Sequence, residues 1–226
     1  MQKSVYRVLY FTSASKYKFV YPQCTAMHPH PAFATIKTAL ALALPSAIRF
    51  RGILYRACDP IYANTNDLLA GEGSRKVGGR WNPPGDVATI YLSQSVEGAI
   101  GESLGLPTHY GLDPVKRLPL TLVAVDAELE GLLDLTDAAI RKSLGVTLAA
   151  LLRSDWRNEN AVGHEALPQA IGRAAFQLGA HGIIVPSAVK RTFRNLNVFR
   201  DNLTGISRLK IRGSEKLPPP AGLGRL

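Results

Sequence analysis

The pattern of apolar and polar residues predicts short strands and helices beyond the first fifty residues. The strand-like segments combine β-branched, aromatic and aliphatic residues between turn-forming ones. We expect strands at 52–57, 88–93, 118–125, 182–185, 196–199 and 206–211. We expect helices at 96–104, 137–143, 147–153 and 165–178. Because strands and helices do not alternate regularly, the expected fold class is α+β, a compact mixed sheet with flanking helices.

The segment 165–178 shows the clearest helical pattern. Apolar residues recur at intervals of three and four, and polar residues occupy the opposite face. The apolar positions are Leu167, Ala170, Ile171, Ala174 and Leu178, and the polar ones are Gln169, Arg173 and Gln177. Gly179 follows as a natural helix end. We therefore expect one face of this helix to pack on the sheet.

Turn-forming residues divide the rest of the chain. The segment 58–86 is rich in Gly, Asn, Asp and Pro and is expected to be a long functional loop. We expect a domain at 51–212 that follows an N-terminal extension, 1–50, which is partly disordered or non-native. A flexible tail, 213–226, carries three consecutive prolines. Met27 is a second possible initiator.

Composition indicates a globular protein. The chain has 226 residues, of which 46% are hydrophobic and 19% charged, so it is neither a disordered tail nor a coiled coil. The net charge of +10 raises nucleic acids, phosphorylated ligands and acidic proteins as partners. The excess lies at both ends, because residues 51–185 hold 12 basic and 15 acidic residues. A nucleic-acid-binding protein with basic ends is thus one alternative.

Cysteine and histidine usage points away from disulfides and metals. Cys24 and Cys58 form no CxxC pair, and the five histidines show no metal-ligand spacing. The apolar run 39–44 is far shorter than the roughly 20 residues of a membrane span. We expect a cytoplasmic protein without a metal.

Another alternative is a serine hydrolase. Residues 101–105 match G-x-S-x-G, the turn that presents a nucleophilic serine between a strand and a helix. The preceding residues have a helical pattern, however, so Ser103 would lie at a helix end without activation. The remaining triad members would be Asp134 or Asp155 with His164 or His181.

Five residues in and around the predicted strands suit the cleavage of a dinucleotide. Two arginines can grip a pyrophosphate through planar, charge-assisted hydrogen bonds, and an aromatic ring can stack on a base. A carboxylate can stabilise the cationic transition state that forms when a bond to the anomeric carbon of a ribose breaks. The five are Arg56, Arg80, Tyr91, Glu102 and Ser187.

The chain resembles the RES-domain toxins of bacterial toxin–antitoxin pairs of the Xre–RES type, which are named for Arg, Glu and Ser. The resemblance covers 52–199 and rests on the order and spacing of several blocks. These are LYRA (54–57), GGRWN (78–82), IYLSQS (90–95), LLDLTD (132–137) and AIGRAAFQLGAHGIIVPSA (170–188). It implies a fold similar to ADP-ribosyltransferases. It also implies consumption of NAD⁺ by hydrolysis or phosphorolysis at the nicotinamide N-glycosidic bond, which arrests growth. The alternative is transfer of ADP-ribose to a protein such as a phosphoribosyl-pyrophosphate synthetase.

The resemblance also implies residue roles. Glu102 would act at the anomeric carbon, with Arg56 and Ser187 as the other catalytic residues. Arg56 and Arg80 would bind the NAD⁺ phosphates or orient the ribose, and Tyr91 would contact the nicotinamide side.

Ser187 would also hydrogen-bond ribose or nicotinamide, and Asn195 would bind NAD⁺. Asn197 stands where the family usually has an apolar residue. The implied partner is a helix-turn-helix antitoxin encoded by the adjacent gene, whose C-terminal part would block the cleft. Nucleic acid would be contacted only through that antitoxin.

Overall fold

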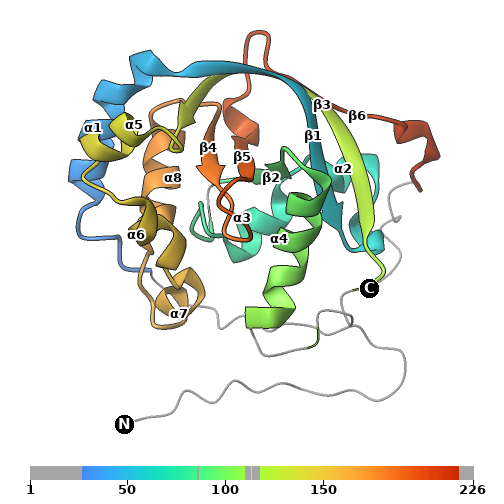
Figure 1. Cartoon of the computed structure of the whole chain (residues 1–226), viewed down its shortest axis with the longest axis horizontal. Helices are drawn as coiled ribbons and strands as arrows, with labels where there is room; N and C mark the ends of the chain where they lie inside the picture. The colour runs from blue at the N-terminus through green and yellow to red at the C-terminus, as the bar shows by residue number, and fades with distance from the viewer. Residues whose placement is uncertain (1–26, 86, 110–112, 114–117, 219–226) are drawn as a thin grey trace.

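Six strands form one mixed sheet in the computed structural model, which describes residues 27–85, 87–109, 113 and 118–218 (Figure 1). The strands are β1 (Ile48–Cys58), β2 (Thr89–Ser93), β3 (Thr121–Asp134), β4 (Gly182–Pro186), β5 (Arg194–Phe199) and β6 (Arg208–Ile211). Their order is β1-β2-β5-β4-β3-β6. Only β3 and β4 are parallel, and the other pairs are antiparallel. The expected mixed sheet with flanking helices is therefore confirmed.

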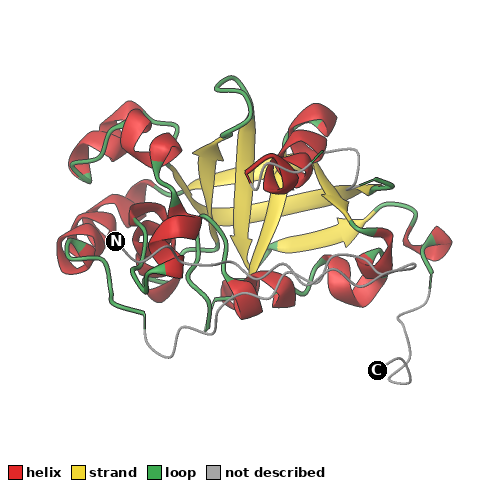
Figure 2. Ribbon diagram, turned by 90° about the horizontal axis from the view of Figure 1, so that it is seen from below, coloured by secondary structure: helices red, strands yellow, loops and turns green. Residues whose placement is uncertain are grey.

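The sheet curls back on itself, because β1 also pairs with β3. Hydrogen bonding thus leads from β1 through β2, β5, β4 and β3 back to β1, while β6 lies at the edge. The contact between β1 and β2 is reduced to a single pair, Tyr55 with Ser93. By contrast, β1 follows β3 along nearly its full length (Figure 1), and Figure 2 shows the curvature of the sheet.

Eight α-helices surround the sheet in the described part of the chain (Figure 1). They are α1 (Phe33–Ala43), α2 (Thr65–Leu68), α3 (Glu72–Val77), α4 (Val96–His109), α5 (Ala138–Ser143), α6 (Leu148–Arg153), α7 (Trp156–Ala161) and α8 (Leu167–Gln177). Side chains of Asp137, Thr147 and Asp155 accept backbone N–H groups at the starts of α5, α6 and α7. Such caps satisfy donors that a helix leaves without partners.

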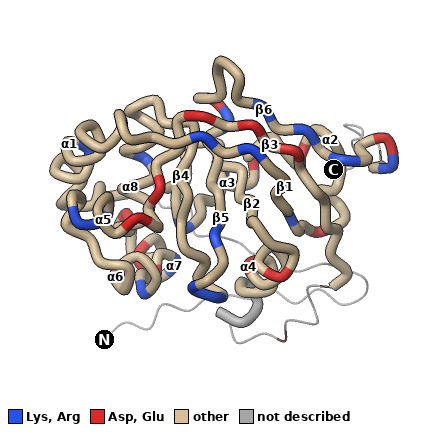
Figure 3. The backbone as a smooth tube through the Cα atoms, turned by 45° about the horizontal axis from the view of Figure 1, so that its top comes forward, with Lys and Arg blue, Asp and Glu red and all other residues tan. Residues whose placement is uncertain are grey.

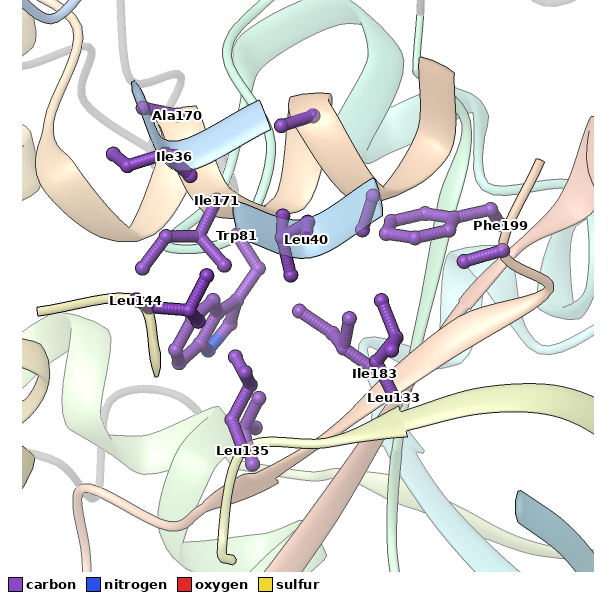
Figure 4. Close-up of a cluster of buried hydrophobic side chains, with 14 of the residues drawn as sticks. Ile36, Leu40, Trp81, Leu133, Leu135, Leu144, Ala170, Ile171, Ile183 and Phe199 are labelled. Atoms are coloured by element: carbon purple, nitrogen blue, oxygen red, sulfur yellow. The ribbon is translucent and has the colours of Figure 1, made fainter. Parts of the chain in front are cut away.

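Two hydrophobic cores lie on the two faces of the sheet. One core joins α1 and α8 to the sheet, and Figure 4 shows Ile36 and Leu40 of α1 beside Ile171, Ile183 and Phe199. The other contains Leu54, Ile90, Val125 and Leu196. Alternate residues of a strand point to opposite faces, which is how β2 and β5 serve both cores.

The segment before β1 belongs to the packed structure. Ile36 is 2% exposed and Leu40 is fully buried, so α1 contributes to the first core. The expected domain boundary at residue 51 falls inside β1. The first 26 residues and the last eight lie outside the described residues.

A charged contact fixes the chain in front of α1. The Glu165 carboxylate, 3% exposed, accepts two hydrogen bonds from Arg173, at 2.6 and 2.7 Å. It also accepts the His30 backbone N–H at 2.9 Å. The Arg173 guanidinium lies 3.5 Å from the centre of the Phe33 ring. Residues 30–33 are thereby tied to the middle of α8 and to Glu165 just before it.

Several expected elements need correction. The segment 58–86 is not one long loop, because it contains α2 and α3. The strand expected at 118–125 runs instead from Thr121 to Asp134, and α1 and α7 were not expected. Helices of four to six residues are too short to show a helical period. In β3, alternation of inward Val125, Ala127 and Leu129 with acidic residues marks the strand's continuation.

No helix among the described residues is long and apolar enough to cross a membrane.

The outer face of β1, β3 and β6 is lined by charges of both signs (Figure 3). Three ion pairs lie there: Arg49 with Glu130, Arg208 with Glu128, and Arg212 with Asp126.

Candidate active site

The Glu102 carboxylate on α4 is held by two neutral side chains. The Ser187 hydroxyl donates a hydrogen bond to Glu102 Oε1 at 2.7 Å, and the Asn195 amide Nδ2 donates to the same oxygen at 2.8 Å. Ser187 follows β4 directly and Asn195 lies at the start of β5, so the ends of two adjacent strands fix one helix residue (Figure 1). The other oxygen, Oε2, accepts no hydrogen bond from any described residue. Glu102 is exposed and can face a ligand.

The Ser187 hydroxyl has a defined direction. Ser187 is 1% exposed, and its oxygen accepts the Val189 backbone N–H at 3.1 Å. Its own proton is thus left to point at Glu102. Gly101 permits this arrangement, because a Cβ there would lie only 2.8 Å from a Val189 methyl carbon. The loop after β4 therefore packs tightly against α4 next to Glu102.

Arg80 lies near enough to Glu102 for the two charges to interact. Its Nη1 donates to the carbonyls of Leu151 and Ser154 at 3.2 and 3.0 Å, which anchors it on the end of α6. Nε and Nη2 donate to no described residue. Burial lowers the pKa of Arg80, and the nearby Glu102 carboxylate partly opposes that effect. An arginine remains a cation despite such a shift, so Arg80 offers a pre-positioned fork for an oxyanion.

Tyr91 fixes the loop that carries Arg80. Its hydroxyl donates to Asn82 Oδ1 at 2.7 Å and accepts the Trp81 backbone N–H at 3.1 Å. Burial raises the pKa of the Tyr91 hydroxyl, which stays protonated as this donor requires. A side chain at Gly79 would collide with Tyr91, since its Cβ would lie 2.2 Å from the hydroxyl oxygen. Both hydrogen bonds of the hydroxyl thus serve the structure, and Tyr91 also packs against the first hydrophobic core.

Asn82 completes this turn and had no role in the sequence analysis. It is fully buried, and its amide nitrogen donates to three carbonyls, those of Ser74, Pro83 and Val87. Together with the Tyr91 contact, all of its side-chain hydrogen-bonding groups are used. Its place in the GGRWN block is the sequence signal for this structural role.

Arg56 reaches the site from the other side of the sheet. It lies on the same face of β1 as Leu54 and Cys58 of the second core, and its Nη1 donates to the Tyr91 carbonyl at 3.5 Å. Its Nε is buried without a hydrogen-bond partner in the described structure, and burial lowers the pKa of Arg56. A buried guanidinium with an unused donor is costly unless an anion or acceptor binds it. No described hydrogen bond joins Arg56 to Glu102.

Asn197 is a second buried amide near the site. It is 1% exposed and lies opposite Tyr91 in the pairing of β5 with β2. Neither of its side-chain polar atoms has a partner in the described part of the chain. The Asn195 Oδ1 atom also has no partner there. This face of β5 thus carries several amide groups without hydrogen-bond partners among the described residues.

The structure argues against a serine hydrolase. Ser103 lies inside α4, which runs from Val96 to His109, and not on a turn between a strand and a helix. A nucleophile elbow needs that turn to expose the serine. The G-x-S-x-G match is therefore a coincidence of sequence.

Two open surface hollows lie away from these residues. One, of about 400 Å³, is lined by residues that include Arg49, Glu130 and His181. The other, of about 380 Å³, lies beside α5. Neither hollow is lined by any of the predicted site residues, so geometry around Glu102, not hollow size, defines the candidate site.

Residues 53–218 match the RES domain, and the chain belongs to this family. The chain is also 33% identical over 124 residues to the NAD(+) phosphorylase MbcT of Mycobacterium bovis and of Mycobacterium tuberculosis. That match covers 54% of this chain and 62% of each relative, which is less than two thirds of their length.

A solved structure resembles most of the fold. The crystal structure of the M. tuberculosis MbcT–MbcA toxin–antitoxin complex aligns with a TM-score of 0.62 at 26% identity. The alignment covers 78% of this chain and 91% of the other.

Proposed function

We propose that this protein cleaves the bond between nicotinamide and ribose in NAD⁺ and is the toxin of a toxin–antitoxin pair. The single observation that carries the proposal is the Glu102 carboxylate, which two neutral donors hold by one oxygen beside the cationic Arg80. Membership of the RES family and the similarity to NAD(+) phosphorylase MbcT support the choice of substrate. The fold is accordingly proposed to be of the ADP-ribosyltransferase type.

The geometry suits stabilisation of a developing cation. As the C1′–N bond breaks, the nicotinamide leaves as a neutral molecule with the bonding electrons, and positive charge develops on the ribose. A carboxylate already fixed in place stabilises that charge without reorganisation. Ser187 and Asn195 occupy Oε1 and leave Oε2 for the ribose. Neutral donors preserve the full negative charge that a partner arginine would neutralise.

The arginines suit the phosphates of NAD⁺. Arg56 has a buried, unused Nε–H donor, and a diphosphate oxygen would satisfy it. We infer that Arg56 binds the diphosphate and that the ring of Tyr91 borders the nicotinamide. The similarity to a toxin–antitoxin complex supports an antitoxin partner, encoded by the neighbouring gene, that covers this site. We also propose a cytoplasmic location, which NAD⁺ consumption and such a partner support.

Nicotinamide release tests the proposal. Purified protein should release nicotinamide from NAD⁺, and Glu102→Gln should lower kcat by a factor of about 10² to 10³, the usual cost of losing a preorganised electrostatic group. Glu97→Gln on the first turn of the same helix is the matched control and should retain activity. Absence of release by the unaltered protein, or equal losses in the two variants, would contradict the proposal. Mass spectrometry of the products would separate ADP-ribose adducts on protein from small-molecule products.

A further inference from the structure

Two amide side chains of β5 have hydrogen-bonding atoms that the mechanism does not use. Oδ1 of Asn195 and both Oδ1 and Nδ2 of Asn197 are buried and have no partner among the described residues. Asn197 as a whole is 1% exposed. A buried polar group without a hydrogen bond costs free energy, and most such groups in native proteins have a partner. These three atoms therefore point to a ligand that would supply the hydrogen bonds.

Both amides point to the sheet face that carries the candidate site. Leu196, which lies between them, belongs to the second core, and side chains alternate along a strand. Asn195 and Asn197 accordingly point to the opposite face. There Asn197 lies between Tyr91 of β2 and Ile183 of β4, its partners in the two strand pairs.

Asn197 lies at a suitable distance from the Glu102 carboxylate. Asn195 Nδ2 donates to Glu102 Oε1 at 2.8 Å, and Asn197 is two residues further along β5, about 7 Å away at the usual rise of a strand. In the proposed reaction Glu102 acts at C1′ of the ribose, which bears the ring nitrogen of nicotinamide. The carboxamide is attached two ring bonds from that nitrogen. A nicotinamide ring that extends from C1′ along β5 therefore brings its carboxamide to Asn197.

The three atoms complement a carboxamide in number and in kind. Asn195 Oδ1 is an acceptor, because the nitrogen of the same amide donates to the Glu102 carboxylate. Asn197 supplies one further acceptor and one donor. A carboxamide presents two N–H groups and one carbonyl oxygen, so every one of these groups finds a partner. A carboxylate or a ketone in its place would leave both acceptors of the protein unpaired.

We propose that Asn197 recognises the carboxamide of nicotinamide, with Asn195 Oδ1 as the second acceptor, and thereby makes the site selective for the amide form of the dinucleotide. The inference rests on the proposed function, which supplies the substrate and assigns no residue to the carboxamide. Tyr91, opposite Asn197 in the pairing of β2 with β5, borders the same ring. A site that hydrogen-bonds a substrate N–H discriminates against an analogue without it, because buried polar groups are then left unpaired.

The test compares NAD⁺ with 3-acetylpyridine adenine dinucleotide, in which a methyl ketone replaces the carboxamide. The analogue keeps the carbonyl and loses both N–H groups. The unaltered protein should release the pyridine base with a kcat/KM at least about tenfold higher for NAD⁺. Asn197→Leu should lower kcat/KM for NAD⁺ at least about tenfold and lower that for the analogue much less. The change in preference between the two proteins isolates the contact, because the intrinsic reactivity of each dinucleotide cancels.

Thermal unfolding distinguishes recognition from a structural role. Leucine has the branching and the number of side-chain heavy atoms of asparagine. Asn197→Leu should leave Tm unchanged or raise it, because it removes unpartnered polar atoms from a buried position. Thr89→Val is the matched control, since Thr89 is 1% exposed and its Oγ1 also lacks a partner in the described part of the chain. This variant should keep the preference for NAD⁺.

Binding of the free bases makes the test independent of turnover. In ligand-observed NMR titrations, nicotinamide should bind the unaltered protein at least about tenfold more tightly than 3-acetylpyridine, and Asn197→Leu should remove most of this difference. If the difference is present and no base is released from NAD⁺, the proposed function fails and the recognition of the carboxamide stands.

Three results would overturn the inference. One is an unchanged preference for NAD⁺ in Asn197→Leu, and another is an equal change of preference in Thr89→Val. The third is a lowered Tm of Asn197→Leu with equal losses on both dinucleotides, which would identify Asn197 as a structural residue.

Discussion

The molecule contains two glutamates that several donors hold, Glu102 at the candidate site and Glu165 just before α8. They differ in burial, in the charge of their donors and in the number of oxygens engaged. Glu165 is buried, and both of its oxygens are engaged by the cation Arg173 and the backbone of residue 30. Glu102 is exposed, and neutral groups engage one oxygen only. A carboxylate whose charge is paired and whose two oxygens already accept hydrogen bonds cannot readily bind a ligand. The comparison therefore separates a structural glutamate from one available for chemistry.

The largest expected effect on stability lies at Glu165. Arg173→Met leaves a buried carboxylate without its cation, and loss of one partner of such a pair costs about 3–5 kcal/mol of unfolding free energy. Denaturant unfolding should show this loss, while kcat per folded molecule should remain unchanged. Glu165→Gln, which keeps the shape and removes the buried charge, should be less harmful. A stable Arg173 variant with lowered kcat would erase the distinction between the two glutamates.

A smaller effect is expected for the donors to Glu102. Ser187→Ala and Asn195→Ala should each lower kcat about tenfold, the value of one hydrogen bond to a charged group. The double variant should lose less than the product of the two, because both donors serve the same oxygen. KM for NAD⁺ should change little. A raised KM with an unchanged kcat would show instead that Ser187 and Asn195 bind the substrate directly.

The smallest effect is expected for an exposed carboxylate, Asp126, which pairs with Arg212 through both oxygens. The hydrogen bonds from Arg212 lower the pKa of Asp126 in the folded protein. Its contribution to stability is thus present above the ordinary aspartate pKa of about 3.9 and is lost as the pH falls through the lower folded value. Asp126→Asn should scarcely change Tm at pH 7. Any difference from the unaltered protein should vanish in acid, and a difference that grows on acidification would contradict this assignment.

The sequence patterns predicted the elements whose apolar residues recur regularly or form a compact run. The helix at 165–178, the strand at 88–93 and the strand at 182–185 correspond to α8, β2 and β4 within a residue or two. The residue types at Arg80, Glu102 and Ser187 also indicated the site's chemistry, because few tasks combine arginines with an isolated carboxylate. The helix and the strands depend on neighbours in the chain, which is why sequence patterns predict them.

Other features depended on contacts that no local pattern reports. The burial of α1 follows from packing on α8, more than 120 residues later in the chain. The helix also lacks a capping side chain, which is a usual sequence signal for a helix start. Asn82 and Asn195 have ordinary polar side chains until the fold places them against Tyr91 and Glu102. The anchoring of Arg80 likewise depends on carbonyls at the end of α6, those of Leu151 and Ser154, which lie more than 70 residues later in the chain.

The sequence by itself therefore determined the class of fold, most strands, and the arginines and glutamate of the candidate site. Only the tertiary structure decided which carboxylate is free. Ser187 lies 85 residues from Glu102, and Asn195 lies 93 residues from it, yet both donate to a single oxygen. Hydrogen bonds act over about 3 Å, so a group's reactivity depends on its neighbours in space and not on its own residue type.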